Sequence, residues 1–394
     1  MRKGLRRTGC GLLVMASAAL VPPAVAQTAP RTAVASDPAL GHRVDAIAAQ
    51  ALASRSTAGL AIGVARNGRP VLLRGYGYAN LENRTPVTAD TVFRIGSITK
   101  EFTAASVLLL AERGKLSADD PLAKYLPGFP RGGEVTLRQL LTHTSGIHNY
   151  TDLEDFLPAK AHLEMITAQM VDLIARQQPL YDFAPGTRYN YSNSGFFLLG
   201  AVIEKVSGQS YAAFVEANVL RPLGLSHTRP DVAAEVLPGR ASGYDKAKDE
   251  PGGFANADYI STTAAAAAGA MRSTVGDLIR WHEALLGGKL LKPASVAMML
   301  TPGRLKDGRV AGTATAGRAD SERAYDYGVG VMIGRQHGRR MIGHGGAING
   351  FNASLETYPD QQTTIVLLTN TGGGAYALSP VLADAVFGTA PSAP

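Results

Sequence analysis

The chain has 394 residues, of which 45% are hydrophobic and 18% charged, and it carries a formal net charge of +7. This composition is typical of a globular protein and excludes a wholly disordered or collagen-like chain. The single cysteine, Cys10, excludes an intrachain disulfide framework and a cysteine-rich zinc or iron–sulfur site.

The first 26 residues have the pattern of a secretory signal peptide. A basic segment from Arg2 to Arg7 precedes an apolar run over residues 11–21, and Ala24-Val25-Ala26 fits the small-residue rule for cleavage. The alternative is an uncleaved membrane anchor, but the apolar run is too short for a comfortable transmembrane helix. We therefore expect export to the periplasm or the medium.

Cleavage after Ala26 would change both the net charge and the cysteine count. The segment holds four Lys and Arg residues and no acidic one, so its removal lowers the net charge from +7 to +3 and leaves no cysteine. Residues 27–41 then form a flexible lead-in. No other stretch reaches ~18 apolar residues, so we expect no stable membrane span after cleavage.

Apolar runs near the start of the globular part predict strands. Residues 60–65 and 71–75 flank Asn67-Gly68, a pair that favours a tight hairpin turn. Residues 91–95 predict a third short strand, and residues 97–113 have the periodicity of a helix.

Helical patterns dominate the middle of the chain, and strands return near its end. We expect a loop over residues 242–258 and helices over residues 163–176, 194–206, 211–220 and 274–286. Later apolar runs predict strands over residues 327–334, 339–343, 351–358 and 363–369. The economical arrangement is an α+β fold, in which one sheet is built from both chain ends and a helical lobe is inserted.

The segment Ser97-Ile98-Thr99-Lys100 begins a predicted helix directly after a strand. Residues three apart on a helix share a face, so the Ser97 hydroxyl and the Lys100 amine would be neighbours. A serine hydroxyl needs a base to take its proton, and a buried lysine can be that base if its pKa falls from ~10.4 toward neutrality. Alternatively, Ser97 only caps the helix, since S-x-x-K alone is a weak pattern.

The segment Tyr191-Ser192-Asn193 lies just before the predicted helix 194–206. A tyrosine beside a lysine can pass a proton to a leaving group. An asparagine amide can hold a substrate carbonyl and orient the lysine. Taken alone, the segment is equally typical of an ordinary capped helix start.

The segment His344-Gly345-Gly346-Ala347 follows the predicted strand 339–343. Small residues on a strand let a ligand lie against the backbone. The backbone N–H of Ala347, together with that of Ser97, would then be an oxyanion donor. The alternative is a glycine-rich turn with an incidental histidine.

The order and context of these segments resemble the penicillin-recognising serine hydrolases, which include class C β-lactamases, D-Ala-D-Ala carboxypeptidases, D-amino-acid peptidases and related esterases. The resemblance runs from about residue 42 to residue 387, and further matching phrases are FRIGSITK (93–100), LLTHTSGI (140–147) and Pro185-Gly186-Thr187. It implies a β-lactamase/transpeptidase-like domain over residues 42–387, with an antiparallel sheet flanked by helices, and a tail over residues 388–394.

The resemblance also implies a two-step acyl transfer that needs no metal or organic cofactor. Ser97 would attack a carbonyl with Lys100 as general base, and water would then hydrolyse the acyl-enzyme. The full implied catalytic set is Ser97, Lys100, Tyr191, Asn193 and His344. Gly345 and Gly346 would bind the substrate, and the backbone of Ser97 and Ala347 would bind the oxyanion.

One segment departs from the β-lactamases of this family, which usually carry Lys-Thr-Gly where this chain has His344-Gly345-Gly346. A histidine with a pKa near ~6.5 is mostly neutral at neutral pH, so a substrate carboxylate would find less fixed charge there. We therefore expect an exported D-Ala-D-Ala carboxypeptidase or D-amino-acid peptidase. An esterase or a weak β-lactamase of the same family is the alternative.

Other function classes have less support. The chain lacks G-x-S-x-G and H-E-x-x-H, the motifs of α/β-hydrolases and zinc proteases, and it has no Lys/Arg run that would favour nucleic acid. The expected partners are small-molecule or peptide substrates, namely a peptidoglycan stem peptide, an ester or a β-lactam. Residues 152–160 and 242–258 are candidate rim loops of the acyl pocket. A non-catalytic penicillin-binding-like scaffold is the alternative from another class.

Overall fold

The computed structural model of the protein describes residue 1 and residues 37–250, 252–315 and 324–389. The predicted signal peptide, most of the lead-in and the end of the tail lie outside these residues. Within the described parts, no helix is long and apolar enough to cross a membrane.

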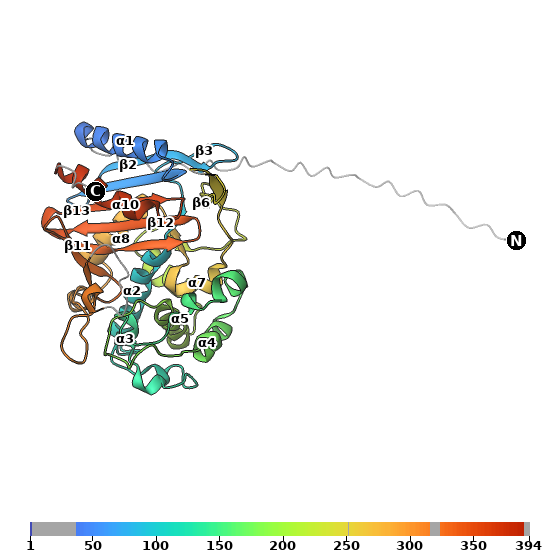
Figure 1. The fold of residues 1–394 in the computed structure, drawn as a ribbon. Helices are drawn as coiled ribbons and strands as arrows, with labels where there is room; N and C mark the ends of the chain where they lie inside the picture. Colours follow the sequence, from blue (N-terminus) through green and yellow to red (C-terminus); the bar gives the residue numbers. More distant parts are fainter. Residues whose placement is uncertain (2–36, 251, 316–323, 390–394) are drawn as a thin grey trace. The chain divides into compact units, whose positions relative to one another are not determined.

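An eight-stranded antiparallel sheet combines strands from both ends of the chain, as expected (Figure 1). Its strand order is β3-β2-β1-β13-β12-β11-β10-β9, so the two ends meet where β1 pairs with β13. The strands are β1 (Gly59–Arg66), β2 (Arg69–Asn80), β3 (Thr85–Pro86), β9 (Tyr325–Tyr327), β10 (Met332–Gln336), β11 (Arg339–Ile348), β12 (Phe351–Tyr358) and β13 (Thr363–Thr369).

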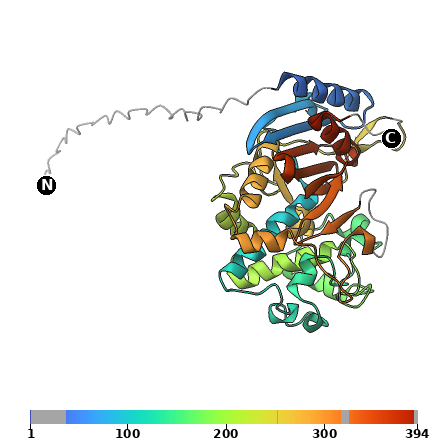
Figure 2. The ribbon, with the colours of Figure 1, turned by 90° about the vertical axis from the view of Figure 1, so that its left-hand side faces the viewer.

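Side chains of β1 alternate between two covered faces of this sheet. Leu60, Ile62 and Val64 pack with residues of α1 (Pro38–Ala53) and α10 (Gly374–Phe387), the two helices on one face. Ala61 and Ala65 belong to the core on the other face, where α8 (Val275–Leu286) lies (Figures 1 and 2). A strand buried on both faces must be apolar throughout, which is why residues 60–65 form an unbroken apolar run.

The helix α1 was not predicted. It begins at Pro38, inside the expected lead-in, and Asp37 caps it by accepting a hydrogen bond from the Leu40 N–H at 3.0 Å. Its buried residues, Leu40, Val44, Ala48 and Ala51, recur every three or four positions, so the helical signal was present in the sequence.

The remaining helices include the inserted lobe that the sequence predicts. They are α2 (Thr99–Glu112), α3 (Leu137–Leu141), α4 (Thr167–Arg176), α5 (Asn193–Ser207), α6 (Tyr211–Val215), α7 (Thr262–Gly269) and α9 (Pro293–Met299). In Figure 1, α2 runs between the sheet and the group of α3, α4 and α5. Residues Thr99 to Leu110 of α2 are all buried, and a helix covered on all sides brings even its polar residues into the interior.

Several predicted strand bounds need correction. The single strand expected over residues 327–334 is wrong, because β9 ends at Tyr327, β10 begins at Met332 and the two pair antiparallel. Between them the Gly328 N–H donates to the Val331 carbonyl at 2.9 Å, and Gly330 has a φ of 75°, a conformation that favours glycine. In contrast, β11 continues past residue 343 to Ile348, since Gly345 and Gly346 pair with β12.

Two smaller sheets also differ from the expectation. The segment over residues 91–95 contributes β4 (Phe93–Arg94), which pairs with β8 (Met271–Ser273) rather than joining the large sheet. β8 also pairs with β5 (Arg229–Pro230). The expected loop over residues 242–258 contains a hairpin of β6 (Tyr244–Lys246) and β7 (Phe254–Asn256).

Gly346→Ala tests the close contact between β11 and the chain before α2. A Cβ atom at this position would lie 1.9 Å from the Ile95 carbonyl oxygen, so the backbone must shift. We expect the free energy of unfolding, measured in urea, to fall by about 1–3 kcal/mol, the usual cost of overpacking. Gly276→Ala in α8 is the control, because its Cβ meets nothing within 4 Å. Equal stability of the two variants would contradict the close contact.

Candidate active site

Ser97 lies in a short 3-10 turn (Gly96–Ile98) that joins β4 to α2. Gly96 has a φ of 51°, and a Cβ there would lie 2.6 Å from the Ala347 backbone nitrogen. Ile95 donates its N–H to Met271 O at 2.9 Å, and Thr99 Oγ1 donates to Gly96 O at 2.6 Å. The turn is therefore fixed on both sides of the serine.

Lys100 is fully buried, and its amine contacts three oxygen atoms. Its Nζ lies 3.0 Å from Ser97 Oγ, 2.7 Å from Asn193 Oδ1 and 2.7 Å from the Ala268 carbonyl oxygen. Burial lowers the pKa of Lys100 well below its usual value. None of the described residues gives this amine a carboxylate partner, so the neutral form is favoured.

The three contacts orient the neutral amine. The Asn193 and Ala268 oxygens belong to carbonyl groups, which only accept hydrogen bonds, so they take both N–H groups of a neutral amine. The third direction holds the nitrogen lone pair, and it points at Ser97 Oγ. The Ser97 hydroxyl then donates to Lys100, which is the arrangement that proton abstraction requires.

Asn193 begins α5, and it is itself held by the chain around residue 150. Its backbone N–H donates to Asn149 Oδ1 at 2.9 Å, and its side-chain Nδ2 donates to Thr151 Oγ1 at 3.1 Å. The Nδ2 contact fixes the amide orientation, so Oδ1 faces Lys100. No sequence motif indicates Asn149, Thr151 or Ala268 as residues of the site.

Tyr191 lies against the same amine, with its ring centroid 4.7 Å from Lys100 Nζ. Its hydroxyl is buried and makes no hydrogen bond within the described part of the chain. Burial raises the pKa of Tyr191 well above its usual value, while the neighbouring Ser97 side chain opposes that shift. Tyr191 is therefore a neutral phenol that still carries its proton.

His143 packs beneath Tyr191, with ring centroids 4.2 Å apart. It comes from the phrase LLTHTSGI, and its Nδ1 accepts the Ser192 N–H at 3.1 Å. Burial, and the nearby Lys100 and His344, lower the pKa of His143 well below its usual value, so the imidazole is neutral. It supports the ring of Tyr191 and the start of α5 together.

His344 is buried in β11, and both of its ring nitrogens are engaged. Nδ1 donates to the Gly345 carbonyl at 2.6 Å, so Nε2 accepts from the Tyr327 hydroxyl at 2.9 Å. Burial is the main cause that lowers the pKa of His344 to about 4. The histidine is neutral at neutral pH, and its ring centroid lies 6.1 Å from that of Tyr191.

The backbone of β11 runs directly past the Ser97 turn. A Cβ at Gly346 would lie 3.3 Å from the Ser97 backbone nitrogen, so the Ser97 and Ala347 N–H groups belong to adjoining segments. At Gly345 a Cβ would meet the Tyr376 ring of α10 at 2.7 Å. The first glycine thus makes room for Tyr376, a residue that no sequence motif indicated.

Across the described residues, no group of three or more His, Cys, Asp or Glu side chains could hold a metal ion. The arrangement that these residues do provide is a serine hydroxyl, a buried neutral amine and a neutral phenol in mutual contact. Such a set can activate the hydroxyl as a nucleophile without a cofactor.

His344→Gln tests the burial of the neutral imidazole. The folded-state pKa of about 4 lies below the ~6.5 of an unfolded histidine, so only the unfolded chain takes up this proton as pH falls. The wild type should therefore lose up to about 3 kcal/mol of unfolding free energy between pH 6.5 and 4 through this group. Denaturation at a series of pH values should show a flatter profile for the glutamine variant. His42→Gln, at an exposed position of α1, is the control, and an identical slope in all three proteins would refute the assignment.

Comparison with known proteins identifies the family of the chain. A family model described as Beta-lactamase matches residues 44–385. Penicillin-binding protein 4* of Bacillus subtilis is 30% identical over 305 residues, which are 75% of this chain and 64% of that protein. Esterase EstB of Burkholderia gladioli is 40% identical over 200 residues, 47% of this chain and 50% of the esterase.

The fold of this chain is also similar to that of solved structures. A D-stereospecific amidohydrolase from Streptomyces sp. superposes with a TM-score of 0.73 at 30% identity, covering 88% of this chain and 99% of that one. The chain thus spans less than two thirds of the two curated relatives but nearly all of this solved neighbour. The family match over most of the described residues is decisive, and the chain belongs to the Beta-lactamase family of serine hydrolases.

Proposed function

We propose that this chain is an exported hydrolase that forms an acyl-enzyme on Ser97 and acts most readily on D-amino-acid peptides or amides. The observation that carries the proposal is the 3.0 Å contact between Ser97 Oγ and the buried amine of Lys100. The amine has a lowered pKa and no carboxylate partner within the described residues, so it can accept the serine proton.

In the first half of the proposed reaction, Ser97 Oγ bonds to the substrate carbonyl carbon while its proton moves to Lys100 Nζ. The N–H groups of Ser97 and Ala347 receive the negative charge that develops on the carbonyl oxygen. The bond to the leaving group then breaks, and the leaving nitrogen or oxygen takes up the proton by way of Tyr191. Lys100 is neutral again when the acyl-enzyme has formed.

Hydrolysis of the acyl-enzyme uses the same groups in reverse. Water gives a proton to the neutral amine of Lys100, either directly or through Tyr191, which passes its own proton to Lys100 as it takes up that of water. The water oxygen bonds to the ester carbon, and the Ser97 oxygen recovers a proton from Lys100 as it leaves. Asn193 supports both halves, since its Oδ1 accepts from Lys100 at 2.7 Å and keeps the lone pair directed at the serine. In this scheme His344 is a positioning residue, because Gly345 and Tyr327 occupy both of its nitrogens.

The substrate class is inferred from the neutral third segment and from the relatives. A neutral His344 provides no fixed positive charge for a β-lactam carboxylate, which favours a peptidase or amidase over an efficient β-lactamase. The Streptomyces neighbour is described as a D-stereospecific amidohydrolase. The similarity to esterase EstB, at 40% identity over 200 residues, favours esters as the second candidate. Export rests on the signal-peptide pattern of residues 1–26.

Covalent labelling tests the acyl-serine. We expect wild-type protein, but not Ser97→Ala, to gain the mass of a fluorescent penicillin on intact-mass spectrometry, because Ser97 Oγ lies 3.0 Å from the buried amine that can take its proton. Ser117→Ala, which removes an exposed serine, should label like wild type. A substrate panel of D-Ala-D-Ala peptide, D-phenylalanine amide, p-nitrophenyl butyrate and nitrocefin then ranks the classes by kcat/KM. The absence of labelling by penicillin, activated esters and D-Ala-D-Ala peptides alike would end the proposal.

A further inference from the structure

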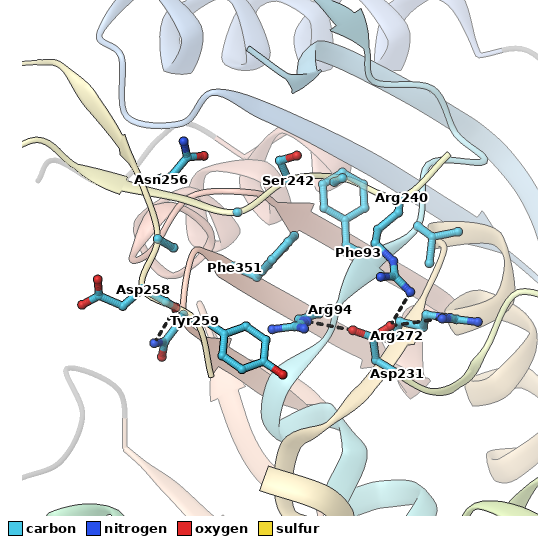
Figure 3. Close-up of a pocket in the computed structure, with 15 residues that line it drawn as sticks. Phe93, Arg94, Asp231, Arg240, Ser242, Asn256, Asp258, Tyr259, Arg272 and Phe351 are labelled. Atoms are coloured by element: carbon cyan, nitrogen blue, oxygen red, sulfur yellow. Dashed lines mark hydrogen bonds and ion pairs between the residues drawn. The ribbon is translucent and has the colours of Figure 1, made fainter. Parts of the chain in front are cut away.

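A pocket of about 300 Å³ lies beside β4, close to the catalytic turn but not lined by Ser97, Lys100 or Tyr191 (Figure 3). Phe93 and Phe351 form apolar walls, and the predicted rim segment 242–258 contributes Ser242 and Asn256. A pocket of this size, with apolar walls and a few polar groups, is typical of a site for a small organic group.

The floor of this pocket carries a surplus of positive charge. The buried carboxylate of Asp231 accepts from three guanidinium groups, those of Arg94 at 2.8 Å, Arg240 at 3.2 Å and Arg272 at 3.1 Å (Figure 3). Glu235 is the second carboxylate in the cluster, 2.7 Å from Arg272. Each guanidinium group has a carboxylate partner, but three guanidinium groups and two carboxylates give the cluster a net charge of +1.

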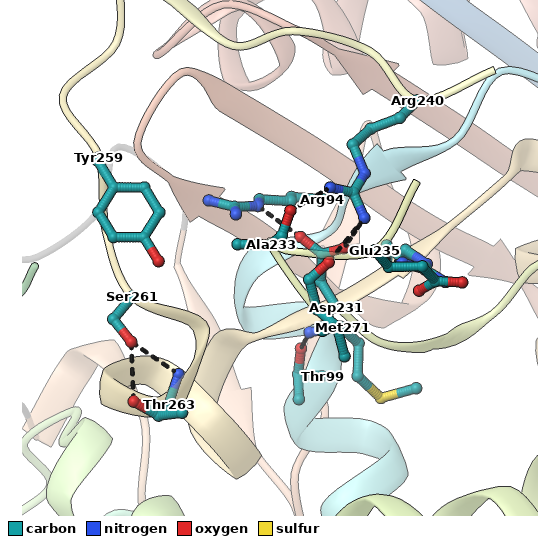
Figure 4. Close-up of polar contacts among 12 residues, drawn as sticks. Arg94, Thr99, Asp231, Ala233, Glu235, Arg240, Tyr259, Ser261, Thr263 and Met271 are labelled. Atoms are coloured by element: carbon teal, nitrogen blue, oxygen red, sulfur yellow. Dashed lines mark hydrogen bonds and ion pairs between the residues drawn. The ribbon is translucent and has the colours of Figure 1, made fainter. Parts of the chain in front are cut away.

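Arg94 presents that charge to the pocket. Only its Nε is engaged, with Asp231 Oδ2, and no other described residue accepts a hydrogen bond from its two terminal nitrogens. Figures 3 and 4 both show the guanidinium end pointing toward Tyr259. Asp258 also lines the pocket, but Figure 3 shows its carboxylate directed away from Arg94. A guanidinium with two free N–H groups on one edge matches the two oxygens of a carboxylate.

Arg240 and Arg272 also favour the binding of an anion near this cluster. The Nε atoms of Arg240 and Arg272 are buried and have no hydrogen-bond partner within the described residues. A buried, unsatisfied N–H group costs free energy, and nearby negative charge reduces that cost. An anion close to this cluster would lower its electrostatic free energy, because the cluster carries a net positive charge.

The position of the pocket identifies which part of a substrate would enter it. Arg94 precedes Ser97 by three residues, so their Cα atoms are within about 10 Å. Asn349, at the other side of the pocket, follows the oxyanion residue Ala347 by two residues. His344, near Tyr191, lies at the opposite end of this segment, up to about 17 Å away along the strand. Along this segment, His344 and the pocket residue Asn349 thus lie on opposite sides of Ala347.

We propose that this pocket is the acyl-side subsite of the enzyme and that it selects acyl groups bearing a carboxylate, which Arg94 binds. The inference rests on the proposed function, in which Tyr191 protonates the leaving group and the acyl portion extends the other way. Methylene groups between the two ends would pack against Phe93 and Phe351, and the carboxylate would accept the two free N–H groups of Arg94.

Paired esters test the subsite. Mono-4-nitrophenyl esters of five- to eight-carbon dicarboxylic acids are compared with neutral 4-nitrophenyl esters of the same chain lengths. We expect wild type to prefer the carboxylate ester in kcat/KM by at least tenfold at its best length. Arg94→Gln should lower kcat/KM for that ester by ~10- to 100-fold, the range of a charge-assisted pair, and abolish the preference.

Arg280→Gln is the matched control, because Arg280 also pairs with a buried carboxylate, that of Asp277 at 2.7 Å, but lies on α8. It should keep the preference. Should Arg94→Gln not fold, as judged by circular dichroism, Asn256→Asp adds a negative charge to the pocket without touching Asp231 and should reduce the preference severalfold.

Two outcomes separate this inference from the proposed function. Turnover of neutral esters with no preference for carboxylate esters in wild type overturns the subsite alone. If no ester is turned over, the result counts against the proposed function. Calorimetric titration of Ser97→Ala with the intact esters then shows whether the pocket binds carboxylate esters more tightly than neutral ones. Equal affinity for charged and neutral esters in that titration overturns the subsite as well.

Discussion

The amine of Lys100 is the group on which the site depends. A charged ammonium would be costly in this position, because the residue is fully buried and its contacts are neutral oxygens. The neutral form uses its two hydrogens on Asn193 and Ala268 and leaves its lone pair for the Ser97 hydroxyl. One buried contact set therefore determines the charge, the orientation and the reactivity of the lysine at once.

The fold supplies this environment by placing α2 in the interior. Its first turn lies between β11 and α7, and residues Thr99 to Leu110 are buried. The close approach at Gly346 brings the backbone of β11 to the Ser97 turn, so one strand can offer an oxyanion donor and also bury His344. The same strand leads to Asn349, which lines the arginine-lined pocket, so the proposed subsite adjoins the strand that carries Ala347.

The sequence predicted those features that depend on local spacing. The three-residue spacing predicted that Ser97 and Lys100 would be neighbours, although Ser97 lies in the 3-10 turn just before α2. The expected sheet from both chain ends follows from apolar runs. The contacts of Ala268, Tyr327 and Tyr376 could not be predicted, because each arises from packing between elements distant in the chain. The turn at Gly328–Gly330 between β9 and β10 could not be predicted either. One long strand and two short strands of a hairpin can both appear in the sequence as a continuous apolar run.

The pH dependence of Ser97 acylation shows whether a neutral Lys100 takes the serine proton. Acylation by an activated ester, followed by stopped flow, should rise with pH as Lys100 loses its proton, with a midpoint well below 10.5. Asn193→Asp places a carboxylate beside the amine, stabilises the ammonium form and should move the midpoint to higher pH. A wild-type midpoint at the ordinary pKa of lysine, or a midpoint that Asn193→Asp does not move, would contradict the account.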